Sequence, residues 1–490
     1  MSDFSALNVG LSGLEAQQLG LDTVGQNVAN ANTPGYVAER ANLSAVSAVQ
    51  HLGFDNPVGA MPGDGVSVTS VSRLDNAFLR QRSYSEQSSQ GMLQAQQSGL
   101  QGVQQNFPEP STNGLSGALT QFWQGWSTLA NNPADIPTRA MLVQQGQNLA
   151  SQLNQTSTSL NTLSEQTAQN ISLSVAQVNQ DATQIANLNQ SIIGASAGGG
   201  SAANELIDQR DQIISQLSNV VGLSVSQGAN NTVNVTVGGE PLVAGVNYQQ
   251  LSLSKSGPPY SLTWSQDQST FQPQSGQLAG MLDVVNNYVP TYQAGLDQVA
   301  HSLMGSVNYL MSTGYDLNGN KGAPFFTGTG AADIQVNPAV ASDPSLIAAA
   351  SAPVPAGSTA TNQDGTIAAD VGELPNSQTA TLAEPTSGWS AGGTASAWSG
   401  ATSSTGQEAD AAYNQLVTAI GQATSTVNTN YANQQAVTTN VNSALQSTTG
   451  VNTDQELTNM VMFQNAYDAS AKFISTVNTT LQTLVSMVNG

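Results

Sequence analysis

Residues 2–30 read SDFSALNVGLSGLEAQQLGLDTVGQNVAN, and in this stretch apolar residues recur at alternating steps of four and three. That spacing places one stripe along a helix and is the seam pattern of a coiled coil. The stripe comprises Leu7, Leu11, Leu14, Leu21 and Val28, with Gln18 and Gly25 at the intervening steps. Turn residues between Asn30 and Tyr36 then break the helix, so its apolar stripe has no partner nearby in the sequence.

The C-terminal stretch carries the same spacing. Its stripe comprises Leu457, Met460, Tyr467, Ile474, Leu481, Val485 and Val488, with Gln464, Ala471 and Asn478 at the intervening steps. An amphipathic helix at one end of the chain can bury its apolar stripe most simply against the helix at the other end, and then against neighbouring subunits. We therefore predict that both stripes are assembly residues. Periodicity alone leaves open that each helix packs on the core of its own domain.

Composition separates this chain from ordinary globular proteins. Only 8% of its 490 residues are charged and 5% are aromatic, against a charged fraction of roughly a quarter in typical domains. Stability must then come from many modest aliphatic contacts, and such a chain gains from burying surface against copies of itself. We expect a secreted structural subunit that assembles.

Charge and cysteine content exclude several classes of function. The formal net charge is −22, and the nine basic residues are scattered, which argues against nucleic acid because phosphate neutralisation needs clustered Lys and Arg. The chain has no cysteine, which excludes disulfides, thiolate metal sites and cysteine catalysis. Residues 1–30 lack the pattern of a cleaved signal peptide, and no stretch is long and apolar enough to span a membrane. The chain is expected to be cytoplasmic or exported without a cleaved signal.

Between the ends, the pattern predicts a mainly α protein with inserted β-rich material. A short hairpin is expected around Val66, Val68 and Val71. Helices are expected over 75–106, 115–129, 136–193, 204–221, 276–311 and 406–447. We expect the last of these to lie beside the 136–193 helix. The runs 223–225, 232–237, 242–243 and 261–264 predict one small antiparallel sheet.

These elements suggest four units. They are a terminal helical core (1–37 plus 450–490), a long-helix bundle (38–200 plus 405–449), a mixed α/β domain (201–330) and a variable insertion (331–404). The insertion is rich in Ala, Ser, Thr and Gly, and it is either a small β-domain or a flexible surface segment.

We find no catalytic constellation, and we predict no catalytic residue, cofactor or metal site. His51 and His301 are too far apart in sequence to form a metal-binding pair. Residues 316–322 resemble the start of a calcium-binding loop, but Thr327 stands where a bidentate Glu is needed, which favours a plain turn. The alternative from another class is a wall hydrolase with paired carboxylates. Its candidates are Glu205, Asp208, Asp211, Glu240, Asp267 and Asp283, of which Asp208 and Asp211 look like helix-surface residues.

Two terminal segments resemble a known class of proteins. Residues 27–36, NVANANTPGY, resemble the N-terminal signature of the bacterial flagellar axial proteins, carried by Asn27, Asn30, Thr33, Gly35 and Tyr36. Residues 463–476, FQNAYDASAKFIST, resemble the matching C-terminal signature. Together they identify the chain as a member of this class.

Interior segments narrow the resemblance to the hook-associated protein 1 (FlgK) type. They are 203–211 with Ile214 and Leu217, 129–135 with Arg139, Gly65–Val66 through Arg73 to Phe78–Leu79, and 316–320 with Phe325–Phe326. The resemblance covers about 1–330 and 405–490 and leaves 331–404 unmatched.

The resemblance implies a non-enzymatic structural adaptor that forms the junction layer between hook and filament by helical self-assembly. The terminal helices would pair in a coiled-coil-like inner core, with the long helices next and the β-material outermost. Implied partners are further copies, hook protein, the second junction protein and an export chaperone, with no nucleic acid and no membrane span. Export would use the flagellar type III apparatus, giving an extracellular location in the flagellum. The alternative is another axial protein: the second junction protein, hook protein or flagellin.

Overall fold

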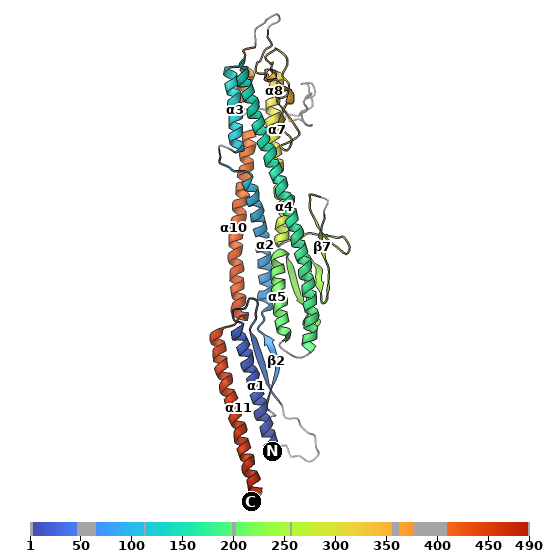
Figure 1. Ribbon diagram of the computed structural model, residues 1–490, viewed down its shortest axis with the longest axis vertical. Coiled ribbons are helices and arrows are strands. Elements are labelled where there is room, and N and C mark those ends of the chain that lie inside the picture. Colours follow the sequence, from blue (N-terminus) through green and yellow to red (C-terminus); the bar gives the residue numbers. More distant parts are fainter. Residues whose placement is uncertain are drawn as a thin grey trace.

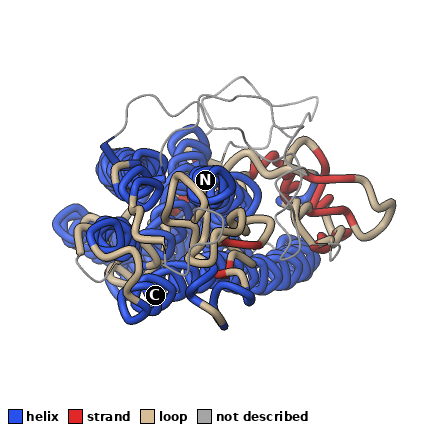
Figure 2. Tube along the Cα trace, turned by 90° about the horizontal axis from the view of Figure 1, so that it is seen from above, coloured by secondary structure: helices blue, strands red, loops and turns tan. Residues whose placement is uncertain are grey.

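The computed structural model describes residues 3–46, 65–111, 114–197, 202–254, 257–354, 362–376 and 409–488. The molecule is elongated, its long helices run along the long axis, and both chain termini lie at the same end (Figure 1). Seen along that axis, the helices form a bundle with strands gathered on one side (Figure 2). The class predicted from the sequence, mainly α with inserted β-material, is confirmed.

The helices include all of the predicted ones, in the predicted order, and two short ones within the described part of the predicted insertion. They are α1 (Asp3–Ala29), α2 (Ala77–Gln105), α3 (Leu115–Asn131), α4 (Ile136–Ala197), α5 (Ala202–Val220), α6 (Gln277–Asp283), α7 (Val289–Thr313), α8 (Pro338–Ser342), α9 (Thr366–Gly372), α10 (Ala409–Thr449) and α11 (Thr453–Val488). A π-helical turn, Val284–Tyr288, joins α6 to α7. Threonines inside the long helices bond back to the carbonyl four residues earlier, as Thr156 does to Gln152. Their hydroxyls are thereby satisfied without charged partners.

The bundle partner of α10 differs from the prediction. α10 packs along α2 and α7, not beside α4. The pairing with α2 includes side-chain bonds from Ser83 to Asn442 (2.6 Å) and from Gln97 to Asn428 (2.8 Å). The apolar stripe of α4 is instead covered by α3, α5 and the strands, so the buried side of α4 is occupied by elements other than α10.

Two hydrophobic cores lie along the long axis. The first, among α2, α3, α4, α7 and α10, centres on the buried aromatic rings of Phe122, Trp126, Phe325 and Phe326. The second joins α4 and α5 to the strands through residues such as Ile185, Ile214 and Val235, all fully buried. Because α4 contributes to both, it ties the molecule together along its length.

The predicted hairpin is confirmed. β1 (Glu39–Ala45) pairs antiparallel with β2 (Val66–Arg73), with Glu39 opposite Arg73 and an irregularity between Asn42 and Leu43. The hairpin packs against α1. It therefore belongs structurally to the end of the molecule that holds the two termini.

The prediction of one interior sheet is wrong. β3 (Leu223–Gln227), β4 (Val233–Val237), β5 (Glu240–Ala244) and β6 (Asn247–Tyr248) form a four-stranded antiparallel sheet. β7 (Leu251–Leu253), β8 (Leu262–Trp264) and β9 (Thr270–Phe271) form a separate three-stranded sheet. At the start of β7, the Asn179 side chain from α4 both donates to the Leu251 carbonyl (2.9 Å) and accepts from its N–H (2.8 Å). The Asn179 side chain therefore forms hydrogen bonds with both the N–H and the carbonyl of Leu251.

The described part of the predicted insertion is core, not a separate β-domain. β11 (Gln335–Val336) pairs with β10 (Phe326–Thr327), and short helices follow. Ile334, Ile347 and Val371 are buried in the first core. The predicted start of an insertion at residue 331 is therefore too early. Residues 355–361 and 377–408 lie outside the described residues, as does His51.

Candidate functional site

The two terminal helices lie side by side at one end of the molecule (Figure 1). The face of α1 that meets α11 is built from small residues. A Cβ atom placed on Gly10 would lie 2.6 Å from Ile474 Cγ1, and one placed on Gly20 would lie 2.7 Å from Phe463 Cε1. Such a face lets two helices approach closely, as in other small-residue helix pairs. The predicted pairing of the ends is confirmed.

The buried face of α1 is not the predicted leucine stripe. Among the described side chains and glycines of α1, the buried ones are Gly10, Ala16, Gly20, Thr23, Val24 and Asn27. Leu7, Leu14, Leu21 and Val28 are half-buried, and Leu11 is 48% exposed. Counting apolar residues in heptads selects leucines and omits glycines. In the structure, however, Gly10, Gly13 and Gly20 lie on the face of α1 that contacts α11. The role of the stripe in assembly remains a prediction.

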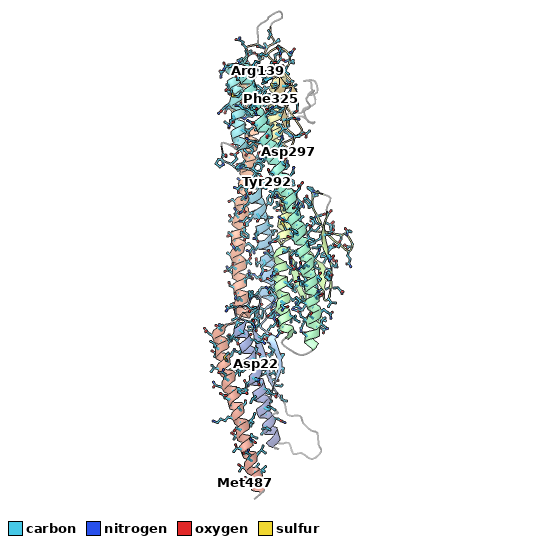
Figure 3. All side chains as sticks on the ribbon, in the orientation of Figure 1. Asp22, Arg139, Tyr292, Asp297, Phe325 and Met487 are labelled. Carbon is cyan, nitrogen blue, oxygen red and sulfur yellow. The ribbon has the colours of Figure 1, made fainter. Side chains whose placement is uncertain are left out.

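Most of the surface of α11 is exposed to solvent. Met460, Tyr467, Ile474 and Leu481 of its predicted stripe are half-buried, whereas Leu457 and Val485 are 52% and 58% exposed. Val488 ends the helix. Further exposed apolar side chains are Val461, Met462, Phe473, Leu484 and Met487. Met487 projects near the tip of the molecule (Figure 3). Among the described side chains of α11, only Glu456 is fully buried.

A hydrogen-bonded turn after α1 explains the first signature residues. The buried amide of Asn27 donates to the Glu39 carbonyl (2.8 Å) and accepts from the Glu39 N–H (2.9 Å). The Tyr36 hydroxyl donates to the same Asn27 Oδ1 at 2.9 Å. One side chain thus fixes the start of β1 against the last turn of α1, because two backbone groups and a hydroxyl converge on it.

The other signature residues shape the loop itself. Thr33 Oγ1 donates to Asn30 Oδ1 (3.1 Å), and the Tyr36 N–H donates to the Thr33 carbonyl (3.2 Å). Gly35 has φ of +83°, a conformation that favours glycine. The loop is also tied to α5, since Asp208 Oδ2 accepts from the Val37 N–H at 3.2 Å.

Asp208 and Asp211 are not free helix-surface residues, so that expectation is wrong. Arg73 of β2 pairs with Asp208 and, at 3.1 Å, with Asp211, while Arg80 of α2 also pairs with Asp211. Burial raises the pKa of Asp208, and the charge of Arg73 opposes that rise. These four charges, the ionic hub, join the terminal hairpin to α2 and α5.

Burial also perturbs groups around the signature turn. It raises the pKa of Glu39, against opposing effects of the Asn204 side chain and the Arg73 charge. It raises the pKa of Tyr36, and the charges of Glu39, Asp208 and Glu456 add to that effect. The Tyr36 hydroxyl therefore stays protonated and keeps donating to Asn27.

The connection from α10 to α11 is held by short-range bonds. The Ala38 N–H donates to the Thr449 carbonyl at 2.9 Å, which links the signature segment to the end of α10. Asn452 then caps α11 by accepting from the N–H groups of Asp454 and Gln455, each at 3.1 Å. The two terminal helices are thus fixed to the bundle at adjacent points.

The remaining hydrolase candidates lie on four different segments of the chain. Glu205, Glu240 and Asp267 are exposed, and Asp283 accepts from the Gln96 and Asn287 amides. The segment from Asp316 is a turn, in which Asp316 Oδ1 accepts from the N–H groups of Asn318 (2.8 Å) and Asn320 (2.7 Å). Within the described residues, no cluster of three or more His, Cys, Asp or Glu is placed to hold a metal ion.

His301 lies on α7, and one of its ring nitrogens is 2.8 Å from the Thr329 carbonyl. None of the helices in the described part of the chain is long and apolar enough to cross a membrane.

Family models match three parts of the chain. A model described as flagella basal body rod protein matches residues 7–36, and one described as flagellar basal body rod FlgEFG protein C-terminal matches 441–487. The first segment contains most of α1, and the second contains nearly all of α11. Such sequences at both ends of a paired-helix fold define a flagellar axial protein. A third model, the flagellar hook-associated protein FlgK helical domain, matches residues 100–326.

Similar proteins narrow the class further. Flagellar hook-associated protein 1 of Salmonella typhimurium is 31% identical over 334 residues, covering 66% of this chain and 59% of that protein. The protein of the same name from Escherichia coli K12 is 27% identical, covering 99% of this chain and all of its own length. The structure of the flagellar hook junction protein FlgK from Burkholderia pseudomallei shares the fold, with a TM-score of 0.61 at 20% identity over 75% of this chain and 100% of that one. The chain is therefore similar to flagellar hook-associated protein 1 (FlgK) over nearly its whole length, and residues 100–326 match the FlgK helical domain.

Proposed function

We propose that this chain is a structural adaptor of the bacterial flagellum that forms the junction layer between hook and filament by self-assembly. The observation that carries the proposal is the paired terminal helices, which keep apolar side chains such as Leu11, Leu457 and Val485 exposed. An apolar helix face open to water is stabilised when another chain covers it. Both helices fall in the segments matched by flagellar rod models.

The further partners follow from the same role. They are other copies of the chain, hook protein on one side and the second junction protein on the other, with an export chaperone before assembly. The protein would leave the cell through the flagellar export apparatus and act outside it. It would have no enzymatic activity. We also propose that the terminal helices, the long-helix bundle and the mixed α/β unit act as separate layers, with the β1–β2 hairpin assigned to the terminal unit, and α7 and the described part of the insertion assigned to the bundle.

Gene deletion tests the role. A strain from which the gene for this chain is deleted should make hooks without filaments and release flagellin into the medium. Expression of this chain should restore attached filaments, scored by motility and electron microscopy. If hooks themselves are lost, the chain acts as hook protein; if only the filament polymer is absent and nothing is released, it acts as flagellin.

Substitution of exposed apolar residues tests the mechanism. Leu11→Gln combined with Val485→Gln removes apolar surface from both terminal helices, at residues 48% and 58% exposed. We expect unchanged thermal unfolding of the monomer and loss of filament attachment. The matched control is Leu173→Gln on α4, 70% exposed, which should still attach filaments. Normal attachment by the double variant would refute the assembly role of the stripes.

Proteolysis tests when the ends become ordered. Helices with so little buried surface gain little from packing in the monomer, so their ordering should be completed in the assembly. Limited proteolysis and circular dichroism of dilute monomer should show cleavage within 1–37 and 450–490. Fully protected ends would contradict this part of the proposal.

A further inference from the structure

Two open grooves flank the signature loop Thr33–Tyr36. The larger, about 1000 Å³, lies between the C-terminal half of α1 and the N-terminal half of α5, and Asp22 and Glu205 are exposed on its rim. The smaller, about 650 Å³, lies between the loop, α2 and α10. Both grooves share the loop and Gln212. We call the combined surface the loop groove.

An aromatic side chain projects from the same level of the molecule. Phe78, in the first turn of α2, is 73% exposed, more than any other large apolar residue in the described part of the chain. One turn further on, Arg82 has a half-exposed side chain whose nearest charged partner is Glu86 at 3.5 Å. An exposed ring beside a cation is the type of side-chain pair that anchors protein interfaces.

The ring and the smaller groove lie on opposite sides of α2. The α2 residues that line the groove include Ser83, Tyr84 and Gln87. At 3.6 residues per turn, Phe78 lies roughly half a turn of the helix away from them. A protrusion on one side and a recess on the other give a contact that repeats from copy to copy in the same direction.

Charge indicates what occupies the groove. With a net charge of −22, copies of this chain repel one another unless their few cations meet carboxylates. Arg82 offers such a cation, and Asp22 and Glu205 offer carboxylates at the groove rim. Pro34, Tyr36 and Leu21 supply apolar surface for a ring within the same groove.

We propose that Phe78 and Arg82 of one copy dock into the loop groove of the next copy, with Arg82 toward Asp22 and Glu205. This inference rests on the proposed self-assembly and names its lateral contact. It also gives a further role to the bonds of Asn27 and Tyr36, because they hold the loop that shapes the groove.

Cysteine cross-linking tests the contact, since the chain has no cysteine of its own. Ser85→Cys lies on the exposed side of α2 with Phe78, and Gln212→Cys lies in the groove. Flagella carrying both substitutions should give a ladder of disulfide-linked copies after mild oxidation, and either single substitution should give none. Adding Phe78→Ala should reduce the ladder about tenfold. The pair Leu173→Cys with Gln212→Cys is the control and should not cross-link.

The outcomes separate this inference from the proposed function. Attached filaments without a ladder would overturn the docking of Phe78 and leave the junction role intact. Dimers from Ser85→Cys alone would overturn the head-to-tail direction. If the cysteine pair prevents filament attachment, charge reversal decides: Arg82→Glu should reduce attachment, and Asp22→Lys with Glu205→Lys should restore it. Failure of that restoration would overturn the contact.

Discussion

The Tyr36 hydroxyl donates a 2.9 Å hydrogen bond to Asn27 Oδ1, nine residues earlier in the chain. The same oxygen accepts from the Glu39 N–H. Asn27 is fully buried. A helix end, a loop and a strand therefore depend on one amide group, which explains in physical terms why the signature pairs these two residues.

Replacing Asn27 should destabilise the terminal end of the molecule. In Asn27→Ala, the carbonyl and N–H of Glu39 lose their partner in a buried position. An unsatisfied buried polar group costs about 1–3 kcal/mol. Tyr36→Phe removes only one donor and should cost about 1 kcal/mol. Urea unfolding followed by circular dichroism gives both values, and equal losses would contradict the central position of Asn27.

Two glycines of α1 should respond in opposite directions to alanine. A Cβ on Gly20 would lie 2.7–2.9 Å from three atoms of the Phe463 ring, whereas nothing lies within 4 Å of one on Gly25. Gly25→Ala should stabilise the helix by about 0.5–1 kcal/mol. Gly20→Ala should lose that gain and separate α1 from α11. Thermal unfolding and proteolysis of the α11 segment measure the difference, and a stabilising Gly20→Ala would show that the helices do not pack this closely.

The stability of the terminal end should depend on pH through Glu39. Burial raises its folded pKa above the ordinary value. Below that ordinary value the carboxyl is protonated in both states and costs nothing. As pH rises through the unfolded and then the folded pKa, the unfolded chain loses its proton more readily and stability falls.

Glu39→Gln should therefore be more favourable at pH 7 than at pH 4, relative to the natural chain. Urea unfolding at both pH values measures this change, with Glu15→Gln, at an exposed position of α1, as the control. The same effect of Glu39→Gln at both pH values would contradict the raised pKa.

Arg139 should be a major contributor to the stability of the first core. It is 1% exposed, and its guanidinium donates to the carbonyls of Pro133 and Ile347, each at 2.7 Å. Arg139→Met leaves both carbonyls without a donor and should cost about 3 kcal/mol. A lysine cannot donate to both carbonyls, so Arg139→Lys should reduce the free energy of unfolding by less than Arg139→Met does. The exposed Arg40 is the control: Arg40→Met should change stability by less than about 0.5 kcal/mol. A similar small change in Arg139→Met would refute this role.

Local periodicity predicted the long helices and the pairing of the terminal helices. It could not predict contacts between residues that lie far apart in the sequence. The 136–193 pattern became α4 because its stripe is buried along its whole length. The glycine face of α1 was missed because glycine contributes nothing to an apolar stripe. The strands β3 to β9 divide into two sheets, and Asn179 bonds to Leu251, which lies 72 residues further along the chain.

The ionic hub shows the same limit for charged residues. Arg73 and Asp211 are 138 residues apart, and no local pattern links them. Within the predicted insertion, Ala348 and Ala349 are buried in the first core, although the composition suggested a small β-domain or a flexible surface segment. Small residues fit in a tightly packed core as well as on a surface, so composition alone does not separate the two. The signature residues were found by resemblance, and the structure supplies their physical role.

The two chain ends lie at one extremity, while α8, α9 and the beginning of α10 lie toward the other (Figure 1). The turns beside α8 (Pro338–Ser342) and α9 (Thr366–Gly372) lie at that second extremity. Loop grafting at these positions is thereby kept remote from the assembling helices. A foreign epitope or enzyme inserted there would be carried as cargo, and it would leave the exposed surface of α1 and α11 uncovered.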